Sequence, residues 1–388
     1  MLFSGAAMEI TKFGPYKTGE LVKISDFPGA DFAFIPDPLP PVWVWPNQLW
    51  PLLLEAHKCL ARLDGVGMHV PDPDLLLIPL QNSEALNSTS LERIYTTPEQ
   101  LLLFQMDPND PGLDKEQVNP SREADNYKNA LRQHSDGSNK LSVSLKLARD
   151  LHRILLTEVR SEDKQPGEFR KTQNQIGKPA RFVPPPPERV TACLDNLEKF
   201  LHGPSDYDPL VKAFLLHYQF EAIHPFVDDN GRVGRLLLAL AVREWCSLSR
   251  PWLCMSAYFN ANKDKYLDLL FKVSSEGGWS EWVAFCLEGV VQQAIDTERR
   301  CLALLDLSGE YRQRIQSIGR GLRLARIADS LFAQPIVRIP YISKMCSVTY
   351  PTAEADIEKL IKVGILQPMK DTKVKTYAAG EILKIAYS

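Results

Sequence analysis

The stretch from Ala213 to Trp245 constrains the fold most, because it places a short polar turn between two strongly apolar segments. Apolar residues recur at helical spacing on both sides of the turn, which predicts two core helices, Pro209–Ile223 and Arg232–Trp245. His224 lies at the end of the first helix, because Pro225 disfavours an α conformation in the residue before it. The sequence therefore predicts a helix pair joined by a polar loop.

Helical spacing elsewhere predicts that most of the chain is α-helical. Further helices are expected at Leu52–Leu63, Glu84–Glu92, Glu123–His134, Leu145–Leu156, Val190–Leu201, Lys263–Ser274 and Ser280 to about Ser317. The pair Asp64-Gly65 predicts the end of the first of them. Residues 158–187 lose this periodicity and end in four consecutive prolines, which predicts a hairpin or flap.

Two segments differ in composition from this helical body. Ile35–Pro51 is rich in proline and tryptophan, which predicts an extended arm whose tryptophans, Trp43, Trp45 and Trp50, are packing anchors. From Arg323 two short helices, at 341–345 and 351–363, precede a strand-like segment at 374–378, which is the order of elements in a winged helix. We therefore divide the chain into an N-terminal arm and helical region at 1–122, a helical core at 123–320 and a winged-helix region at 321–388.

Composition excludes several classes of protein. The 388 residues are 44% hydrophobic and 24% charged, as in ordinary globular proteins, and the net charge of −3 gives no general reason to bind a polyanion. The seven cysteines are scattered without a C-x-x-C pair, which predicts reduced thiols in a cytoplasmic protein without structural zinc. No run of about 18 apolar residues occurs, so we expect no membrane association.

The polar loop offers a site for several phosphate groups. A turn that leads into a helix presents backbone N–H groups at the positive end of the helix dipole, where phosphate binds. Arg232 and Arg235 are three residues apart on one helical face, so both guanidinium groups can converge on a polyphosphate. We assign the nucleotide contacts to Asp229, Asn230, Gly231, Arg232, Val233, Gly234 and Arg235.

The loop also carries a base and a candidate metal ligand. His224 can take a proton from a hydroxyl near neutral pH, because the unperturbed pKa of histidine is about 6.5. Asp228 can hold one Mg²⁺ whose other ligands are phosphate oxygens and water, or it can simply cap the following helix. The loop therefore combines a base, a metal ligand and positive charge for a leaving pyrophosphate.

These twelve residues resemble the signature of the Fic family. That signature reads His-Pro-Phe-x-Asp/Glu-Gly-Asn-Gly-Arg-x-x-Arg, and this chain has His224-Pro225-Phe226-Val227-Asp228-Asp229-Asn230-Gly231-Arg232-Val233-Gly234-Arg235. The departure is Asp229, which stands where the family has glycine. A carboxylate there adds negative charge beside the expected phosphates, and the backbone loses the freedom of glycine.

The resemblance covers roughly Pro41 to Val290 and implies a fold and an activity. The implied fold is mainly α, with a Fic/Fido helical core, a small β-hairpin flap, an N-terminal helical region with a Pro-rich arm and a C-terminal winged helix. The implied activity is transfer of AMP from ATP, with Mg²⁺, to a Ser, Thr or Tyr hydroxyl of a target protein. The target would dock on the flap near Gln173–Gly177, and Tyr266 would lie near the adenosine.

A second resemblance implies a built-in brake. The segment Ser88-Thr89-Ser90-Leu91-Glu92 is similar to the inhibitory Fic motif Ser/Thr-x-x-x-Glu, with Arg93 in place of a small final residue. Ser88 and Glu92 are four residues apart and share a helical face. The resemblance implies that Glu92 pairs with Arg235 and keeps it from the terminal phosphate. The same glutamate would position a water that removes AMP.

Two other functions stay open. Asp229 also suits a nucleotide-binding regulator that has lost catalysis, and the winged helix also suits a DNA-binding regulator. The region has local positive charge from Lys359, Lys362, Lys370, Lys373 and Lys375. However, Glu354, Asp356 and Glu358 on the presumed recognition helix would repel phosphates, so we favour protein docking or a homodimer contact over DNA.

Overall fold

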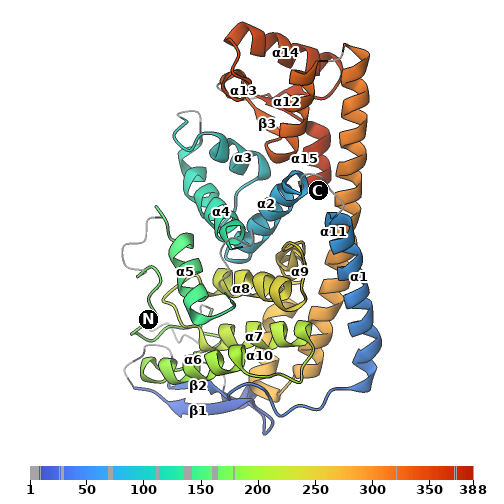
Figure 1. Ribbon diagram of the computed structural model, residues 1–388. Helices are drawn as coiled ribbons and strands as arrows, with labels where there is room; N and C mark the ends of the chain where they lie inside the picture. Colours follow the sequence, from blue (N-terminus) through green and yellow to red (C-terminus); the bar gives the residue numbers. More distant parts are fainter. Residues whose placement is uncertain are drawn as a thin grey trace. The chain divides into compact units, whose positions relative to one another are not determined.

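A computed structural model shows a chain built mainly of α-helices (Figure 1). It describes residues 8, 10–25, 27, 30–68, 73–110, 113–134, 142–159, 165–177, 180–319, 321–370, 372 and 374–387. These residues form fifteen α-helices and two small antiparallel sheets, which confirms the predicted mainly α class. No helix in the described part of the chain combines the length and the apolar composition that a membrane crossing requires.

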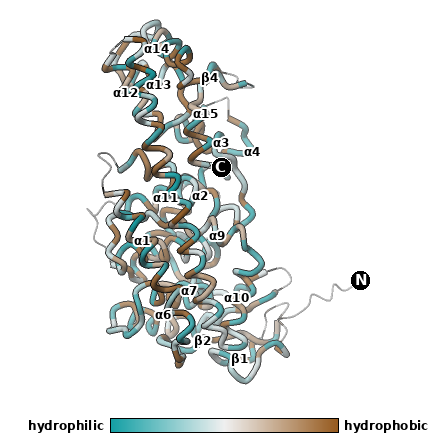
Figure 2. The backbone as a smooth tube through the Cα atoms, turned by 90° about the vertical axis from the view of Figure 1, so that its right-hand side faces the viewer, coloured by the Kyte–Doolittle hydropathy of each residue, from teal (hydrophilic) through white to brown (hydrophobic). Residues whose placement is uncertain are grey.

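The elements follow one another in a simple order. The helices are α1 (Trp50–Met68), α2 (Asp74–Leu91), α3 (Pro98–Met106), α4 (Lys115–Gln133), α5 (Leu145–Leu155), α6 (Pro187–His202), α7 (Pro209–Ile223), α8 (Asn230–Trp245), α9 (Met255–Ala261), α10 (Lys263–Glu276), α11 (Trp279–Ser317), α12 (Leu322–Ala333), α13 (Ile339–Cys346), α14 (Tyr350–Lys362) and α15 (Gly380–Tyr387). The strands are β1 (Gly19–Lys23), β2 (Phe32–Pro36), β3 (Ile336–Val337), β4 (Gln367–Pro368) and β5 (Tyr377–Ala378). Figure 2 shows apolar and polar stretches in turn along the helices, as expected of helices that bury one face.

The chain groups into two compact units, each assembled from three segments. Unit 1 comprises Met1–Cys59, Asn129–Pro251 and Tyr258–Gln292. Unit 2 comprises Leu60–Lys128, Trp252–Ala257 and Gln293–Ser388. The three regions inferred from the sequence divide the chain along its length, and that division stays a prediction.

The helix pair predicted around the polar loop forms the centre of unit 1. Helices α7 and α8 pack against each other, and α6, α10 and β2 also contact α7 (Figure 1). Apart from its first residue and Lys212, every residue of α7 is buried. The two helices approach closely at Gly234, where an added Cβ would lie 2.2 Å from Glu221 Oε1. The apolar pattern around the loop thus correctly predicted a core helix pair.

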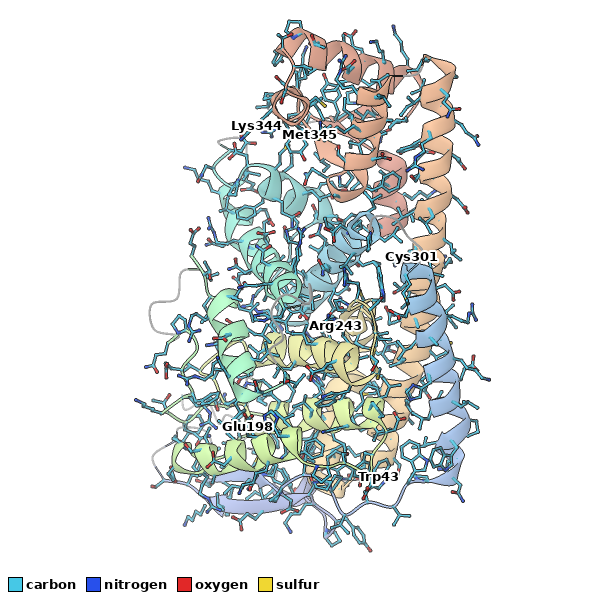
Figure 3. The ribbon with its side chains drawn as sticks, in the orientation of Figure 1. Trp43, Glu198, Arg243, Cys301, Lys344 and Met345 are labelled. Carbon is cyan, nitrogen blue, oxygen red and sulfur yellow. The ribbon has the colours of Figure 1, made fainter. Side chains whose placement is uncertain are left out.

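Helix α5 is held beside this pair by contacts at its first turn. Ser144 is the N-cap of α5, and its Oγ accepts the N–H of Leu147 at 3.2 Å. Glu198 on α6 accepts the N–H of Leu145 at 2.8 Å (Figure 3). Since α5 also contacts α8, these bonds bring its side chains to the polar loop.

The N-terminal segment of unit 1 contains a hairpin that the sequence did not predict. Strands β1 and β2 pair antiparallel, with Gly19 opposite Pro36 and Lys23 opposite Phe32. β2 reads Phe-Ala-Phe-Ile-Pro and is buried on both faces over most of its length, so it lacks the alternation that marks a strand.

The Pro-rich arm follows β2 and lies on unit 1 as expected. Residues 37–46 form no helix or strand. Trp43 donates its indole N–H to Ser280 Oγ at 3.0 Å and stacks on Tyr207 with ring centroids 6.2 Å apart (Figure 3). The prediction of an extended arm anchored by tryptophan is confirmed for this part of the segment.

Helix α2 is the central element of unit 2. It contacts α3, α12 and α15, and the Asn82 amide donates to Tyr387 Oη at 3.1 Å. Leu102 of α3 forms a buried cluster with Ile336 and Ala378, which belong to the C-terminal sheet. Segments from both ends of the chain thus build one core.

Two helices begin earlier than predicted, because each continues through a proline. α2 begins at Asp74 and contains Pro79, and α4 begins at Lys115 and contains Pro120. Each proline lies beyond the first turn and removes an intrahelical N–H bond, so packing must offset its cost. Leu76, Leu77 and Leu80 are buried, so tertiary packing stabilises the first turns of α2.

The predicted helix end at Asp64-Gly65 is wrong, because α1 continues to Met68. Gly67 serves packing instead of termination. A Cβ on Gly67 would lie 2.1 Å from the ring of Trp252, and Asp64 Oδ1 accepts the indole N–H of that tryptophan at 3.1 Å.

The C-terminal residues contain the elements that a winged helix requires. α12, β3, α13, α14, β4 and β5 follow in this order, and the three strands pair as β3-β5-β4. The winged-helix assignment itself stays a prediction. One expectation about its charge is wrong, because Asp356 is 1% exposed and pairs with Arg323 and so does not repel phosphate from the surface of α14.

Candidate active site

The polar loop begins where α7 ends. His224 follows Ile223 in the left-handed region, at φ 49°. Its backbone N–H still donates to the carbonyl of Phe220 at 2.9 Å, and Pro225 then prevents the helix from continuing. The structure confirms the predicted position of His224 at the helix end and leaves its side chain partly exposed.

Contacts with Glu221 determine the tautomer of His224. The Nδ1 atom of His224 lies 3.3 Å from the Glu221 carbonyl oxygen. A carbonyl oxygen only accepts hydrogen bonds, so Nδ1 carries the hydrogen, and the lone pair of the neutral ring is on Nε2. The Glu221 carboxylate is 3.9 Å from the same Nδ1 and favours the imidazolium that forms when Nε2 takes a proton. The neutral imidazole can therefore accept a proton at Nε2, and its role as general base stays a prediction.

Asn230 holds the backbone of the loop. Its Oδ1 accepts the N–H of Phe226 at 2.8 Å, and its Nδ2 donates to the carbonyl of the same residue at 3.0 Å. The side chain is 1% exposed. The structure therefore gives Asn230 a role in shaping the loop, and its predicted nucleotide contact stays a prediction.

Arg170 is a second residue that holds the loop, and the sequence did not reveal it. Its buried guanidinium donates to the carbonyls of His224 at 2.9 Å, Thr172 at 3.0 Å, Pro185 at 2.6 Å and Ile223 at 3.4 Å. Burial lowers the pKa of Arg170 to about 10, so it stays charged at neutral pH. No local sequence pattern marks such a residue, because its partners are backbone carbonyls.

The predicted flap contacts the same loop. The flap residues Gln173–Gly177 contain Asn174, whose amide donates to the carbonyl of Phe226 at 3.0 Å and to that of His224 at 3.4 Å. Within this segment Ile176 pairs with Phe182 in a single antiparallel bridge, and residues 178 and 179 lie outside the described residues. The predicted hairpin is thus present as one bridge, and its role in docking a target stays a prediction.

The far end of the loop contains an ion pair. Asp229, the N-cap of α8, adopts φ 63°, a left-handed conformation that aspartate tolerates better than most residues. Its Oδ1 accepts from Arg232, with Nε at 3.1 Å and Nη2 closer. The Arg232 side chain is fully buried, and Arg235 one turn later is 3% exposed. In this structure Arg232 thus binds a carboxylate of its own loop.

Family comparisons agree with this geometry. Residues 142–242 match the Fic/DOC family, and residues 50–135 match the N-terminal part of the Fic/DOC family. Two separate segments of the chain are thus similar to the Fic/DOC family. The matched core contains α5, α7 and the Fic loop, whose histidine and ion pair are described above.

Curated relatives of the Fic segment are named protein adenylyltransferase Fic. The chain is 38% identical to the protein of Drosophila grimshawi over 101 residues, which is 26% of this chain and 20% of the relative. It is 39% identical to that of Drosophila virilis and 36% identical to that of Drosophila melanogaster, again over 101 residues, 26% of this chain and 20% of each relative. The matched stretch thus spans about a fifth of these curated relatives.

Solved structures of Fic proteins share the fold. A Fic family protein from Desulfovibrio desulfuricans has a TM-score of 0.54 at 17% identity, covering 88% of this chain and 98% of that protein. Fic-1, residues 134–508, from C. elegans has a TM-score of 0.50 at 19% identity, covering 67% of this chain and 75% of that protein. The predicted Fic helical core is confirmed.

His152 supports the Fic loop from α5 and was not predicted as a site residue. Its ring stacks on Phe226 with centroids 3.9 Å apart, and its Nδ1 accepts the N–H of Gly167 at 2.9 Å. Burial lowers the pKa of His152 to about 4, so the imidazole is neutral at physiological pH.

Tyr266, which we expected near the adenosine, is buried in an aromatic cluster. Its hydroxyl lies 2.8 Å from His217 Nε2, while Nδ1 of that histidine lies 3.1 Å from the carbonyl of Gly234. The carbonyl only accepts, so Nδ1 donates and Nε2 accepts from the tyrosine. Burial, followed by the charge of Arg235, lowers the pKa of His217 to about 3. His217 thus connects Tyr266 to α8, and the adenosine contact stays a prediction.

The remaining predicted nucleotide contacts lie in the first turns of α8. Gly231 is half-buried, and Val233 is buried and donates its N–H to the Asp229 carbonyl at 3.1 Å. Gly234 permits the close approach to α7 described above. The structure explains Val233 and Gly234 by helix formation and packing, and their nucleotide contacts stay predictions.

The predicted brake residues belong to unit 2, whereas the Fic loop belongs to unit 1. Ser88 is buried inside α2, and Glu92 is the C-cap of this helix. Arg93 follows at φ 63° and ends it. The predicted helical placement of Ser88 is confirmed, while the pairing of Glu92 with Arg235 stays a prediction.

Asp228 is the exposed carboxylate of the Fic loop. Its Oδ1 accepts the N–H of Asp229 at 2.9 Å, so it also stabilises the turn. Among the residues that the structure describes, no three His, Cys, Asp or Glu side chains form a metal-binding group. A single exposed carboxylate still fits Mg²⁺ when phosphate oxygens and water supply the other ligands.

Proposed function

We propose that this chain is a protein adenylyltransferase, which transfers AMP from ATP to a hydroxyl group of a target protein. The observation that carries the proposal is the His224 imidazole, whose Nε2 lone pair is set by the contact of Nδ1 with Glu221, in the loop that leads into α8. The Drosophila relatives that match the Fic core are named for this activity.

The proposed reaction uses the chain's own groups in three ways. His224 Nε2 takes the hydroxyl proton as the hydroxyl oxygen attacks the α-phosphorus of ATP. The new P–O bond forms as the bond between the α-phosphorus and the bridging oxygen breaks, and pyrophosphate leaves. The N–H groups at the start of α8 and the guanidinium of Arg235 stabilise the phosphate charge.

A magnesium ion fits the proposal through Asp228. Mg²⁺ neutralises phosphate charge when it is bound, and it needs few protein ligands. The exposed Asp228 carboxylate would be its ligand from the chain.

Regulation and target docking are finer parts of the proposal. Glu92 would restrain Arg235 and so limit transfer, and the same carboxylate would position a water for AMP removal. The target would add an extended segment to the flap near Gln173–Gly177, because edge pairing recognises the backbone. These parts rest on the sequence resemblance, whereas a cytoplasmic site of action rests on the scattered cysteines, which fit reduced thiols.

Transfer of labelled AMP tests the proposed function. The parent chain and a Glu92→Gly variant are incubated with Mg²⁺ and ATP labelled at the α-phosphate, and label on protein is measured. We expect His224→Ala to lower transfer at least about 100-fold in both backgrounds, because a general base contributes roughly 10²- to 10⁴-fold. The His224→Ala variants should still bind ATP, as measured by calorimetry.

The matched control is His202→Ala, which removes an exposed histidine at the end of α6. It should label protein like its parent. Undiminished transfer by His224→Ala would refute the base assignment. If both backgrounds bind ATP and neither transfers label, the chain is a nucleotide-binding regulator instead.

A further inference from the structure

The ion pair between Asp229 and Arg232 reduces the positive charge that the Fic loop presents to a phosphate. Asp229 and Arg232 are three residues apart, and their side chains are 4% and 0% exposed. The carboxylate accepts from both Nε and Nη2 of the guanidinium. The edge of the guanidinium that carries these two donors, and that would suit a phosphate, thus points to a carboxylate. Within this pair the charge of Arg232 is neutralised.

The backbone keeps the pair in place. Asp229 is the N-cap of α8, a position where aspartate commonly accepts an N–H of the first turn, yet here its carboxylate is directed to Arg232. Asp228 fills the turn role instead by accepting the N–H of Asp229 at 2.9 Å. The Asp229 carboxylate thus does not cap the N–H groups in the first turn of α8, which keep their partial positive charge.

Separating the pair to recruit Arg232 is unfavourable. A buried carboxylate that loses its guanidinium retains a desolvated charge, which is strongly destabilising. A phosphate would therefore have to compete with a preformed, desolvated partner that is only three residues away. Arg235 lies one turn further along α8 and is 3% exposed.

We propose that Asp229 is a specificity-determining residue, whose carboxylate keeps Arg232 from binding the phosphates of the nucleotide. Only Arg235 and the N–H groups at the start of α8 then contact the polyphosphate. This inference rests on the proposed use of the loop as a nucleotide site. The residue at the position where the Fic signature has glycine thus controls how much positive charge the site offers to the phosphates. The consequence is a site in which each added phosphate increases affinity only slightly.

Binding of AMP, ADP and ATP tests the inference without requiring catalysis. Calorimetry of the full chain in EDTA gives the affinity of each nucleotide for the parent and for Asp229→Asn, a substitution that keeps a residue suited to positive φ. In the parent, ATP should bind within about threefold of ADP. In Asp229→Asn, ATP affinity should rise about tenfold, because Arg232 gains a charge-assisted bond to phosphate.

Two further variants show which residue is responsible. Asp229→Asn/Arg232→Gln should lose the tenfold gain, because the arginine that was released is gone. Asp195→Asn removes the same charge from an exposed position on α6 and should change ATP affinity by no more than about twofold. Thermal unfolding of each variant establishes that it is folded.

Several results would overturn the inference. They are an ATP gain in Asp195→Asn equal to that in Asp229→Asn, an Asp229→Asn variant that binds ATP no better than the parent, retention of the gain in the double variant, and failure of every form to bind any of the three nucleotides. Label transfer is measured separately. Loss of transfer with the expected affinities would refute the adenylyltransferase activity and leave this inference standing.

Discussion

At the scale of single residues, one side chain of the flap binds two backbone carbonyls of the Fic loop. Asn174 donates to Phe226 at 3.0 Å and to His224 at 3.4 Å. Loss of these two bonds would let the His224 backbone shift, and small misplacements of a base lower catalysis strongly. The flap is therefore part of the apparatus that positions the base.

We expect Asn174→Ala to lower label transfer about tenfold while ATP affinity stays within about twofold. Initial rates at several ATP concentrations separate the two effects. The control is Gln219→Ala, which deletes an amide that donates to the Asp37 carbonyl at 2.9 Å outside the loop. Equal losses of transfer in the two variants would show that Asn174 acts only through stability.

Two buried histidines predict how stability depends on pH. Burial lowers the pKa of His152 to about 4 and that of His217 to about 3, both below the ordinary 6.5. Below about pH 6.5 the unfolded chain takes up protons at these sites that the folded chain does not. Stability is therefore complete above that pH and decreases towards pH 4, by up to about 1.4 kcal/mol per pH unit for each histidine.

Urea unfolding between pH 7.5 and 4.5 measures this dependence. His217→Gln keeps a donor and an acceptor for Gly234 and Tyr266 but does not titrate. Its stability should fall less steeply with decreasing pH than that of the parent, by about the contribution of one histidine. Parallel curves for the two proteins would contradict the assignment of His217 as a neutral buried group.

At the scale of elements, helix ends depend on packing that a sequence does not display. Gly65 and Gly67 look like termination signals, yet α1 continues through both, because Trp252 from a distant segment fills the space beside Gly67. The two glycines differ in surroundings, since nothing lies within 4 Å of a Cβ added at Gly65.

The same substitution should therefore have opposite effects at the two glycines. Gly67→Ala places a methyl group 2.1 Å from the Trp252 ring and should destabilise the protein by about 1–3 kcal/mol. Gly65→Ala should stabilise it by up to about 1 kcal/mol, because alanine favours the helix. Chemical unfolding of both variants checks this, and changes of the same sign would contradict the packing role of Gly67.

The sequence predicted those elements whose local pattern matches their environment. The apolar periodicity around His224 gave α7 and α8, and the twelve-residue motif gave the loop. It did not give β2, which is buried without alternation, or Arg170, whose four acceptors are backbone carbonyls. Nor did it give the partner of Asp229, because a pairing inside a turn depends on the positive φ that the fold imposes.

At the scale of the whole molecule, the proposed brake involves Glu92 of unit 2 and Arg235 of unit 1. We expect Glu92→Gly to raise label transfer about 10- to 150-fold, the effect of removing a charge-assisted pair with Arg235. Arg235→Ala should lose transfer, and the double variant should resemble it, because releasing an absent arginine has no effect. Initial rates of all four forms, over a roughly tenfold range of protein concentration, also show whether the restraint acts within one chain.

The control for the brake is Arg93→Gly, which introduces glycine beside the end of α2 and leaves Glu92 in place. Its rate should stay within about twofold of the parent, because glycine suits the left-handed conformation found there. A rate as high as that of Glu92→Gly would mean that loosening the helix end, and not loss of the carboxylate, releases activity.

The division of the chain into interleaved segments has a consequence for its synthesis. Unit 1 has all its segments once Gln292 has left the ribosome, whereas unit 2 requires segments that continue to the last residues of the chain. Because α2 packs on α12 and α15, it lacks these partners while the nascent chain is still growing. His224 and its loop can therefore fold before the helix that carries the proposed restraint is fully supported, so the proposed activity would precede its restraint.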